Sequence, residues 1–379
     1  MEKVCVIGTG IVPFGKMPEK SVVDLAWPAV KQAYEEAAID PLDIEAVFCG
    51  TVFGGNLIGQ RIMKALGVTG LPVVNVENAC SSSSAALRQG WMAVASGCND
   101  LVLVIGVEKL TKFGGGTIPL DDEDCEVSQG LTMPALYAMR AQRYMHEFGL
   151  TERQLAQVAV KAHDHGALNP NAQLRKRFTL DEVMSARMVA SPFTLVHCCP
   201  TGDGAGAAIL ASAKKARALT SSPVRIVASE LTSGKFMNGF RDMTTPEITV
   251  RGARQAYEMA GLGPKDIDVA EVHDAFTIAE LLYYEAFGFC PRGEAFAYLD
   301  SGATSLGGKQ PVNPSGGLLS RGHPVGATGI VQAAEIVRQL NGRAGAHQVE
   351  GAKIGLSHAT GGGVAGFDHG ACSIHIFAK

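Results

Sequence analysis

Cys80 lies between a run of residues typical of a β-strand and a run typical of a helix. Apolar and β-branched residues fill 71–76, and residues 81–95 predict a helix that ends at Ser96-Gly97. Free N–H groups and the positive end of the dipole at a helix N-terminus favour a thiolate, which can attack a thioester carbonyl. Free cysteines are most often simply buried. The position alone therefore leaves a nucleophile and a buried thiol as equal alternatives.

Three histidines occur in contexts that suit chemistry. His323 lies in the glycine-rich run RGHPVGATG, where the following proline favours an extended backbone. His273 lies in EVHDAF at the end of a predicted strand, where sites form in α/β sheets. His358 ends a predicted strand and precedes ATGGG, whose backbone N–H groups could hold an oxyanion. The structural alternatives are a surface turn for His323, a polar capping cluster for His273 and a flexible turn after His358.

A thiol and several imidazoles form a coherent catalytic set. One imidazole can deprotonate the thiol, and another can polarise a carbonyl or move a proton at carbon. Backbone N–H groups can carry the oxyanion of a thioester. Such a set works only if the fold brings these distant segments together.

An internal repeat indicates how the fold does this. The sequence QAYE occurs at residues 32–35 and again at 255–258, and at the same offset Pro41 matches Pro264. Each copy follows a strand-like run and predicts an amphipathic helix, a proline-containing turn and an apolar strand. A period this long indicates a duplicated domain. Strands that alternate with helices in both copies predict an α/β fold.

The two copies differ in length, and the excess defines the predicted domains. It lies between about Phe113 and Cys199, begins with GGG and the acidic run at 121–124, and continues with predicted helices at 134–148 and 152–165. We expect this insertion to be a loop domain or lid. The predicted division is 1–112 with 200–245, 113–199 as the insertion, and 246–379.

Composition excludes several classes of protein. The chain has 379 residues, 33 of them basic and 37 acidic, so nucleic acid or an anionic membrane is not expected as the main partner. Its apolar runs are too short to span a bilayer. Nine irregularly spaced cysteines favour a reducing compartment, and the first residues resemble no signal peptide, so a cytoplasmic location is expected.

Taken together, the motifs resemble those of the thiolase family, in the subgroup similar to sterol-carrier-protein-type thiolases and their archaeal and bacterial relatives. NACSS, HDAF, GHPVGATG and the terminal glycine run occur in the family's order, and the resemblance covers the whole chain. It implies two duplicated βαβαβαββ halves in an α/β/α/β/α layered arrangement with an inserted loop domain. It also implies that Cys80 accepts the acyl group, that His323 activates it, and that the N–H groups of Cys80 and Gly361 form an oxyanion hole. His273 stands where other thiolases carry an asparagine that orients a water toward the 3-oxo group.

Two departures from the family pattern concern a second cysteine. Thiolases carry it as acid/base at the substrate α-carbon, at a position matched here by Ala359, and sterol-carrier-type members carry one in HDCF, matched by Ala275. The hypothesis is that His358 or His273 takes this role.

The resemblance implies an acyl-CoA C-acyltransferase that thiolyses a 3-oxoacyl-CoA, or runs the reverse Claisen condensation, with coenzyme A as co-substrate and no permanently bound cofactor. A bulky, branched or aromatic acyl-CoA such as 2-benzoylsuccinyl-CoA, and a small zinc-ribbon/OB-fold partner, are expected from the subgroup, as is at least a homodimer. The alternatives are a ketosynthase or hydroxymethylglutaryl-CoA synthase-like enzyme, a retro-aldolase-type relative, and a silent acyl-CoA-binding subunit.

Two weaker signals complete the set of candidate residues. Arg175-Lys176-Arg177 could meet the phosphates of coenzyme A, although a solvated basic face is the commoner explanation. His197-Cys198-Cys199 suggests a metal, but neighbouring residues of a strand point to opposite faces and no second ligand pair is near in sequence. No metal site is therefore predicted.

Overall fold

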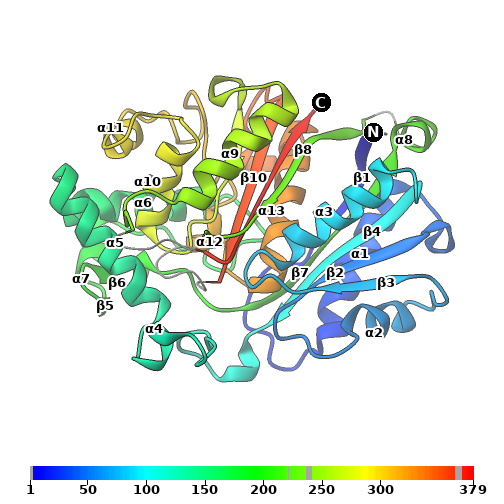
Figure 1. Cartoon of the computed structure of the whole chain (residues 1–379), viewed down its shortest axis with the longest axis horizontal. Coiled ribbons are helices and arrows are strands. Elements are labelled where there is room, and N and C mark those ends of the chain that lie inside the picture. Colours follow the sequence, from blue (N-terminus) through cyan, green and yellow to red (C-terminus); the bar gives the residue numbers. More distant parts are fainter. Residues whose placement is uncertain (1–2, 221, 236–240, 363–368) are drawn as a thin grey trace.

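A computed structural model describes residues 3–220, 222–235, 241–362 and 369–379 (Figure 1). Its main feature is a mixed sheet of nine described strands in the order β3-β2-β4-β7-β1-β8-β11-β10-β9. The strands of the first part are β1 (Val4–Ile11), β2 (Ala46–Gly50), β3 (Val73–Val76), β4 (Leu101–Lys109) and β7 (Asp203–Ser212). Those of the second part are β8 (Val224–Thr232), β9 (Val269–Glu271), β10 (Ile354–Gly361) and β11 (Ala371–Ala378).

Helices divide the molecule into layers. The helices α3 (Ser82–Ala95) and α13 (Val325–Leu340) lie between the two parts of the sheet, and each contacts strands of both parts (Figure 1). The outer face of the first part is covered by α1 (Val22–Ala37) and that of the second by α9 (Glu247–Ala260). The predicted α/β layering is confirmed, with the two parts joined where β1 pairs antiparallel with β8.

The sequence repeat corresponds to a structural repeat. Both α1 and α9 end at the matched alanines, Ala37 and Ala260, and a 3-10 turn follows each at Pro41–Asp43 and Pro264–Asp266. The parallel strands β2 and β9 come next. The halves are not identical, because an isolated parallel bridge between Ala270 and Val312 stands where the first half has β3.

The segment between β4 and β7 is mostly helical. It contains α4 (Cys125–Ser128), α5 (Met133–Phe148), α6 (Glu152–Gly166) and α7 (Leu180–Ser185), followed by the hairpin of β5 (Met188–Ala190) and β6 (Phe193–Thr194). In the second half, α10 (Thr277–Ala286), α11 (Ala295–Asp300) and α12 (Gly317–Arg321) precede α13. Because α5 and α6 pack on α10, and α6 also on α12, this segment lies beside helices of the second half, on the side of the molecule away from β2 and β3 (Figure 1).

Two further short helices, α2 (Ile58–Ala65) and α8 (Ala213–Leu219), pack on strands of the first part. None of the helices in the described ranges combines the length and the apolar character needed to cross a membrane.

The strand before the last glycine run ends later than predicted. His358 was expected to end a strand, but β10 continues to Gly361 because β11 pairs with it as far as Gly361–Ala371. His358 is therefore an interior strand residue opposite Ile374. Gly363, the third glycine of the run, lies outside the described residues.

Candidate active site

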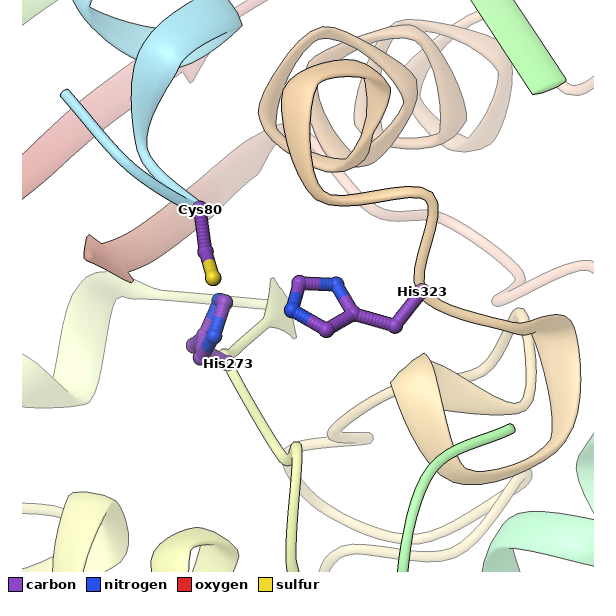
Figure 2. A group of neighbouring side chains, drawn as sticks. All are labelled: Cys80, His273 and His323. Carbon is purple, nitrogen blue, oxygen red and sulfur yellow. The ribbon is translucent and has the colours of Figure 1, made fainter. Parts of the chain in front are cut away.

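Cys80, His273 and His323 meet at one point, although they come from three distant segments. One donor atom of each side chain, the Cys80 sulfur and a ring nitrogen of each histidine, lies within 4.8 Å of the other two. Figure 2 shows the sulfur pointing toward both imidazoles. Cys80 precedes α3, His273 follows β9 and His323 precedes α13. The fold thus unites three of the residues that the sequence singled out.

A strained turn presents Cys80. Ala79 has φ +47°, a left-handed conformation that is unfavourable for a residue with a Cβ. The Ser82 hydroxyl stabilises this turn, because it accepts the Asn78 N–H at 2.9 Å and donates to the Ala79 carbonyl at 2.6 Å. The predicted strand-to-helix junction is therefore present, and the chain directs the thiol away from α3 toward the two histidines.

Close packing of α3 on α13 sets the distance between Cys80 and His323. The Ser83 hydroxyl accepts the Ile330 N–H at 3.0 Å, and a Cβ added at Gly329 would lie 2.6 Å from Ser84 Cβ. Small residues in SSSSAA and GATG are what allow the two helices to approach so closely.

The tautomer of His323 follows from its hydrogen bonds. Its Nδ1 lies 2.8 Å from the Thr328 hydroxyl, and that hydroxyl donates its single hydrogen to the Pro324 carbonyl at 3.0 Å. This arrangement favours the tautomer in which Nδ1 carries the ring proton and donates it to Thr328. The lone pair of Nε2 is then free to accept a proton from the Cys80 thiol.

His273 is buried beside His323, with ring centroids 5.0 Å apart in an edge-to-face arrangement. Its Nδ1 has no hydrogen-bond partner among the described residues. Burial lowers the pKa of His273 to about 3, and the Arg321 guanidinium adds to this effect. The imidazole is therefore neutral at pH 7, and its buried Nδ1 keeps a hydrogen-bonding position that no described residue uses.

Buried polar contacts join the His273 segment to the loop that carries His323. Glu271 accepts the backbone N–H of Ser315 at 3.0 Å and lies 3.3 Å from the Arg321 guanidinium, with both charged side chains fully buried. Asp274 accepts the Leu318 N–H at 2.6 Å. These contacts cross-link EVHDAF to NPSGGLLSRGHP and so hold the two histidine segments in a fixed relation to each other.

The protonation state of Cys80 differs from the expectation drawn from its helix terminus. Burial raises the pKa of the thiol to about 12, and the Glu108 and Glu77 carboxylates add to the rise, while the N–H groups of Cys80 and Gly362 oppose it. Burial also holds the pKa of His323 well below its usual value, as do His273 and Arg321. At pH 7 the site therefore holds a neutral thiol beside a neutral imidazole, and attack requires transfer of the thiol proton to that base.

Alkylation by iodoacetamide should report this state. We expect the rate at Cys80, followed by peptide mass spectrometry, to rise about tenfold per pH unit between about pH 7 and 9, because the thiolate fraction does so below the pKa. A rate that levels off near pH 7 would contradict the prediction, since it would indicate a stable thiolate–imidazolium pair.

Gly361 lies against the backbone of Cys80. A Cβ added at this glycine would be 2.9 Å from the Cys80 nitrogen and 2.2 Å from the Asn78 carbonyl oxygen, so no other residue fits. The backbone of the β10 end is thus near enough to share an anion with the Cys80 N–H, and the Gly362 N–H is a further donor there.

The structure does not bring His358 to the sulfur. Its Nδ1 accepts the His273 N–H at 3.4 Å, and its Nε2 lies 3.2 Å from the Thr249 hydroxyl. The adjacent Ala359 points to the opposite face of β10, as alternation in a strand requires, and its carbonyl accepts the Ser81 hydroxyl at 3.3 Å. His358 therefore supports the backbone of His273, and both of its ring nitrogens have hydrogen-bond partners.

The basic run at 175–177 is exposed, as expected if it forms a solvated basic face. Lys176 pairs with Glu182 at 3.0 Å, and Arg177 with Asp164 at 3.7 Å. However, the backbone N–H groups just before the run, at 173 and 174, donate to the Arg321 and Ser320 carbonyls. The run therefore begins beside the loop that carries His323.

Two groups of side chains contain donors that could suit a metal. His197 Nδ1 lies 2.9 Å from the Thr277 hydroxyl, which gives this histidine a structural partner. Cys80, His273 and His323 offer a thiol and two imidazoles, donors that suit Zn²⁺. A metal bound there would occupy the sulfur that the chemistry needs.

Sequence reasoning missed several residues of the site. Thr328 lies in GATG and could have been found from its i,i+5 spacing to His323. Glu77 and Glu108 carried no sequence signal, because a lone carboxylate acts on Cys80 only through its position in space.

Comparisons with known proteins agree with this geometry. A family model described as the thiolase N-terminal domain matches residues 4–214, and one described as thiolase C-terminal domain-like matches residues 229–368.

Similar proteins include an acetyl-CoA acetyltransferase of Methanothermobacter thermautotrophicus, 44% identical over 388 residues and covering 100% of both chains. The benzoylsuccinyl-CoA thiolase subunit BbsB of Thauera aromatica is 40% identical over 95% of each chain. A solved structure described as an Ltp2-ChsH2(DUF35) aldolase superposes with a TM-score of 0.86 and 28% identity, over 98% of this chain and 97% of that one. These matches span the sheet, the helix that follows Cys80 and the loops of both histidines, and the chain belongs to the thiolase family of acyltransferases.

Proposed function

We propose that the protein thiolyses 3-oxoacyl-CoA esters through an acyl group carried on Cys80, or runs the reverse condensation. The observation that carries the proposal is the meeting of the Cys80 sulfur with a ring nitrogen of His273 and of His323, all within 4.8 Å.

In the first half-reaction, His323 Nε2 takes the Cys80 proton as the sulfur attacks the 3-oxo carbon. The bond between C2 and C3 then breaks, and its electron pair passes to C2 of the departing acyl-CoA. The proton that His323 took from the thiol passes through the adjacent His273 to C2, which releases that acyl-CoA and returns both imidazoles to the neutral form. The remaining acyl group stays on Cys80 as a thioester.

In the second half-reaction, the thiol of coenzyme A gives its proton to an imidazole and attacks the acyl-enzyme carbonyl. The Cys80 sulfur leaves and is reprotonated, which restores the site. The N–H groups of Cys80 and Gly361, with that of Gly362, would hold the oxyanion in this step.

We assign the proton transfer at C2 to His273. Neither Ala359 nor Ala275 can exchange a proton, and the ring nitrogens of His358 are engaged with other groups. Support comes from the free Nδ1 of His273 among the described residues. Coenzyme A would act as co-substrate, its phosphates near residues 175–177, with no permanently bound cofactor.

For the substrate, we propose a bulky or aromatic acyl group, and for the assembly at least a homodimer with a small zinc-ribbon/OB-fold partner. The relative BbsB is described as a subunit of a benzoylsuccinyl-CoA thiolase, and the name of the similar aldolase includes DUF35. The edge strand β3 is exposed, with Val74 46% accessible, which suits pairing with a second copy.

The decisive experiment incubates the purified protein with a 3-oxoacyl-CoA and free coenzyme A. We expect two shorter acyl-CoA products and, without coenzyme A, a mass increase on the Cys80 peptide. A protein that forms neither would contradict the proposal. Co-purification from the native source would identify a partner.

A retro-aldol reaction is the second candidate, favoured by the aldolase neighbour and by the absence of the second cysteine. It would cleave a 3-hydroxyacyl-CoA without coenzyme A. A 3-hydroxyacyl-CoA offered without coenzyme A therefore separates the two, because a thiolase leaves it intact.

Thr328→Val should lower kcat/KM for thiolysis about fivefold, because the Nδ1–H of His323 loses its acceptor and the reactive tautomer loses about 1 kcal/mol. Thr328→Ser, which keeps the hydroxyl, is the matched control. Equal rates for the two variants would show that the tautomer is held by something else.

A further inference from the structure

We propose that the cavity beside Cys80 is an acyl pocket that selects uncharged acyl groups over groups that carry a free carboxylate. The inference rests on the proposed thiolysis and names its substrate class. It also narrows the acyl groups suggested above to those that reach Cys80 without a free carboxylate of their own.

The cavity has a volume of about 580 Å³ and includes Asn78, Ala79, Gly361 and Gly362, the backbone around the nucleophile. Its apolar wall comes from the loop after β2 and from the segment leading into α4 and α5: Val52, Phe53, Leu120, Val127, Leu131, Met133 and Leu136. This size and lining suit a drug-sized apolar group such as a phenyl ring or a branched chain.

The polar part of the lining is acidic. Four carboxylates contribute to it, those of Glu77, Asp121, Asp124 and Glu126, and the described lining contains no Lys, Arg or His. Residues 363–368 add no basic residue in sequence. The Lys112 nitrogen lies 5.5 Å from the centre of the Phe53 ring, but Lys112 does not line the cavity. Even with its single positive charge counted, the net charge around the cavity would stay negative.

Glu77 is the carboxylate most firmly placed. Its Oε1 accepts the Ala79 N–H at 2.6 Å, which orients the carboxylate next to the residue that precedes the nucleophile. Its charge is also one of those that raise the pKa of Cys80. Any acyl group bound to Cys80 through this cavity passes near this fixed negative charge.

The same charges argue against this cavity as the route for coenzyme A. Coenzyme A carries several phosphate charges, which four carboxylates would repel. The basic run at 175–177, beside the His323 loop, suits those phosphates better. The acidic cavity is thus left for the acyl group.

The test compares 3-oxoadipyl-CoA with its 6-methyl ester, which have the same skeleton and differ by one carboxylate charge. We expect kcat/KM to be at least about tenfold higher for the ester at low salt, because each carboxylate about 8 Å away at an effective dielectric constant of about 40 contributes about fivefold. The preference should weaken as NaCl is raised to about 0.5 M.

Glu77→Gln keeps an oxygen for the Ala79 N–H and removes the charge, so the ester-to-acid ratio should fall about fivefold. Glu350→Gln, which removes an exposed charge outside the cavity lining, is the matched control and should leave the ratio unchanged.

The outcomes are distinct. Cleavage of neither substrate would overturn the proposed thiolysis. Cleavage of both with equal kcat/KM at low salt would overturn this inference and leave thiolysis standing. If the enzyme prefers the ester but this preference changes neither with salt nor in Glu77→Gln, the carboxylate charges are not its cause and the inference is wrong. The salt series needs no variant, so the inference stays testable if the substitution destabilises the protein.

Discussion

Replacing Cys80 with alanine is expected to lower the rate of 3-oxoacyl-CoA thiolysis by at least about 10⁴-fold, because the acyl-enzyme can no longer form. The binding of substrate should change little, since the fold around the sulfur depends on Ser82, Ser83 and the glycines of β10 and α13 rather than on the thiol. Loss of the enolate absorbance of the 3-oxoacyl-CoA and the mass of the Cys80 peptide together measure the effect.

Cys80→Ser is the matched control, because it keeps the size of the side chain and replaces the sulfur by a poorer nucleophile. We expect a small residual rate and a detectable ester on Ser. Substantial thiolysis by Cys80→Ala would mean that the reaction bypasses this residue.

Replacing His323 with alanine is expected to lower kcat by about 10²–10⁴-fold, the usual contribution of a positioned general base. The direction in which the activity of this variant changes with pH follows from the pKa of Cys80. With the pKa of Cys80 raised to about 12, the variant holds almost only thiol at pH 7. Its activity should therefore rise steadily with pH, whereas the wild-type rate should depend less steeply on pH, because His323 supplies the base.

His273→Asn provides the comparison for this result. Asparagine occupies this position in other thiolases by the resemblance described above, and it cannot exchange a proton at C2. We expect this variant to form the acyl-enzyme slowly and to lack the steep rise with pH. A His323→Ala profile as flat as that of His273→Asn would reject His323 as the base.

Much of the fold could be predicted from the sequence because local residue patterns indicate each helix, turn and strand. The matched QAYE helices, their proline turns and the strands after them are repeated in order, and hydrophobic periodicity marks each element. The helices of the insertion end as predicted, at Phe148 and within one residue of His165.

The site was predicted less completely, and His358 shows why. Its place before a glycine run is typical of a turn, but pairing with β11 extends the strand, and both ring nitrogens engage groups other than Cys80. The orientation of a side chain on a strand depends on register with a distant partner, which local sequence does not encode.

The protonation state of Cys80 is a second example. A helix N-terminus favours a thiolate, and this local effect can be read from sequence. Burial and the carboxylates of Glu108 and Glu77 act in the opposite direction and prevail. Both depend on which residues the fold places around the sulfur.

Residue type, order and spacing were enough to predict the family and the duplicated α/β architecture, and to single out Cys80, His273 and His323 as candidate catalytic residues. Which histidines reach the sulfur, which tautomer of His323 is favoured and what charge lines the cavity all depend on the tertiary structure. These properties arise from contacts of a few ångströms between segments distant in the chain, such as those of Ser81 and Ala359, and electrostatic and hydrogen-bond energies depend on distances at that scale.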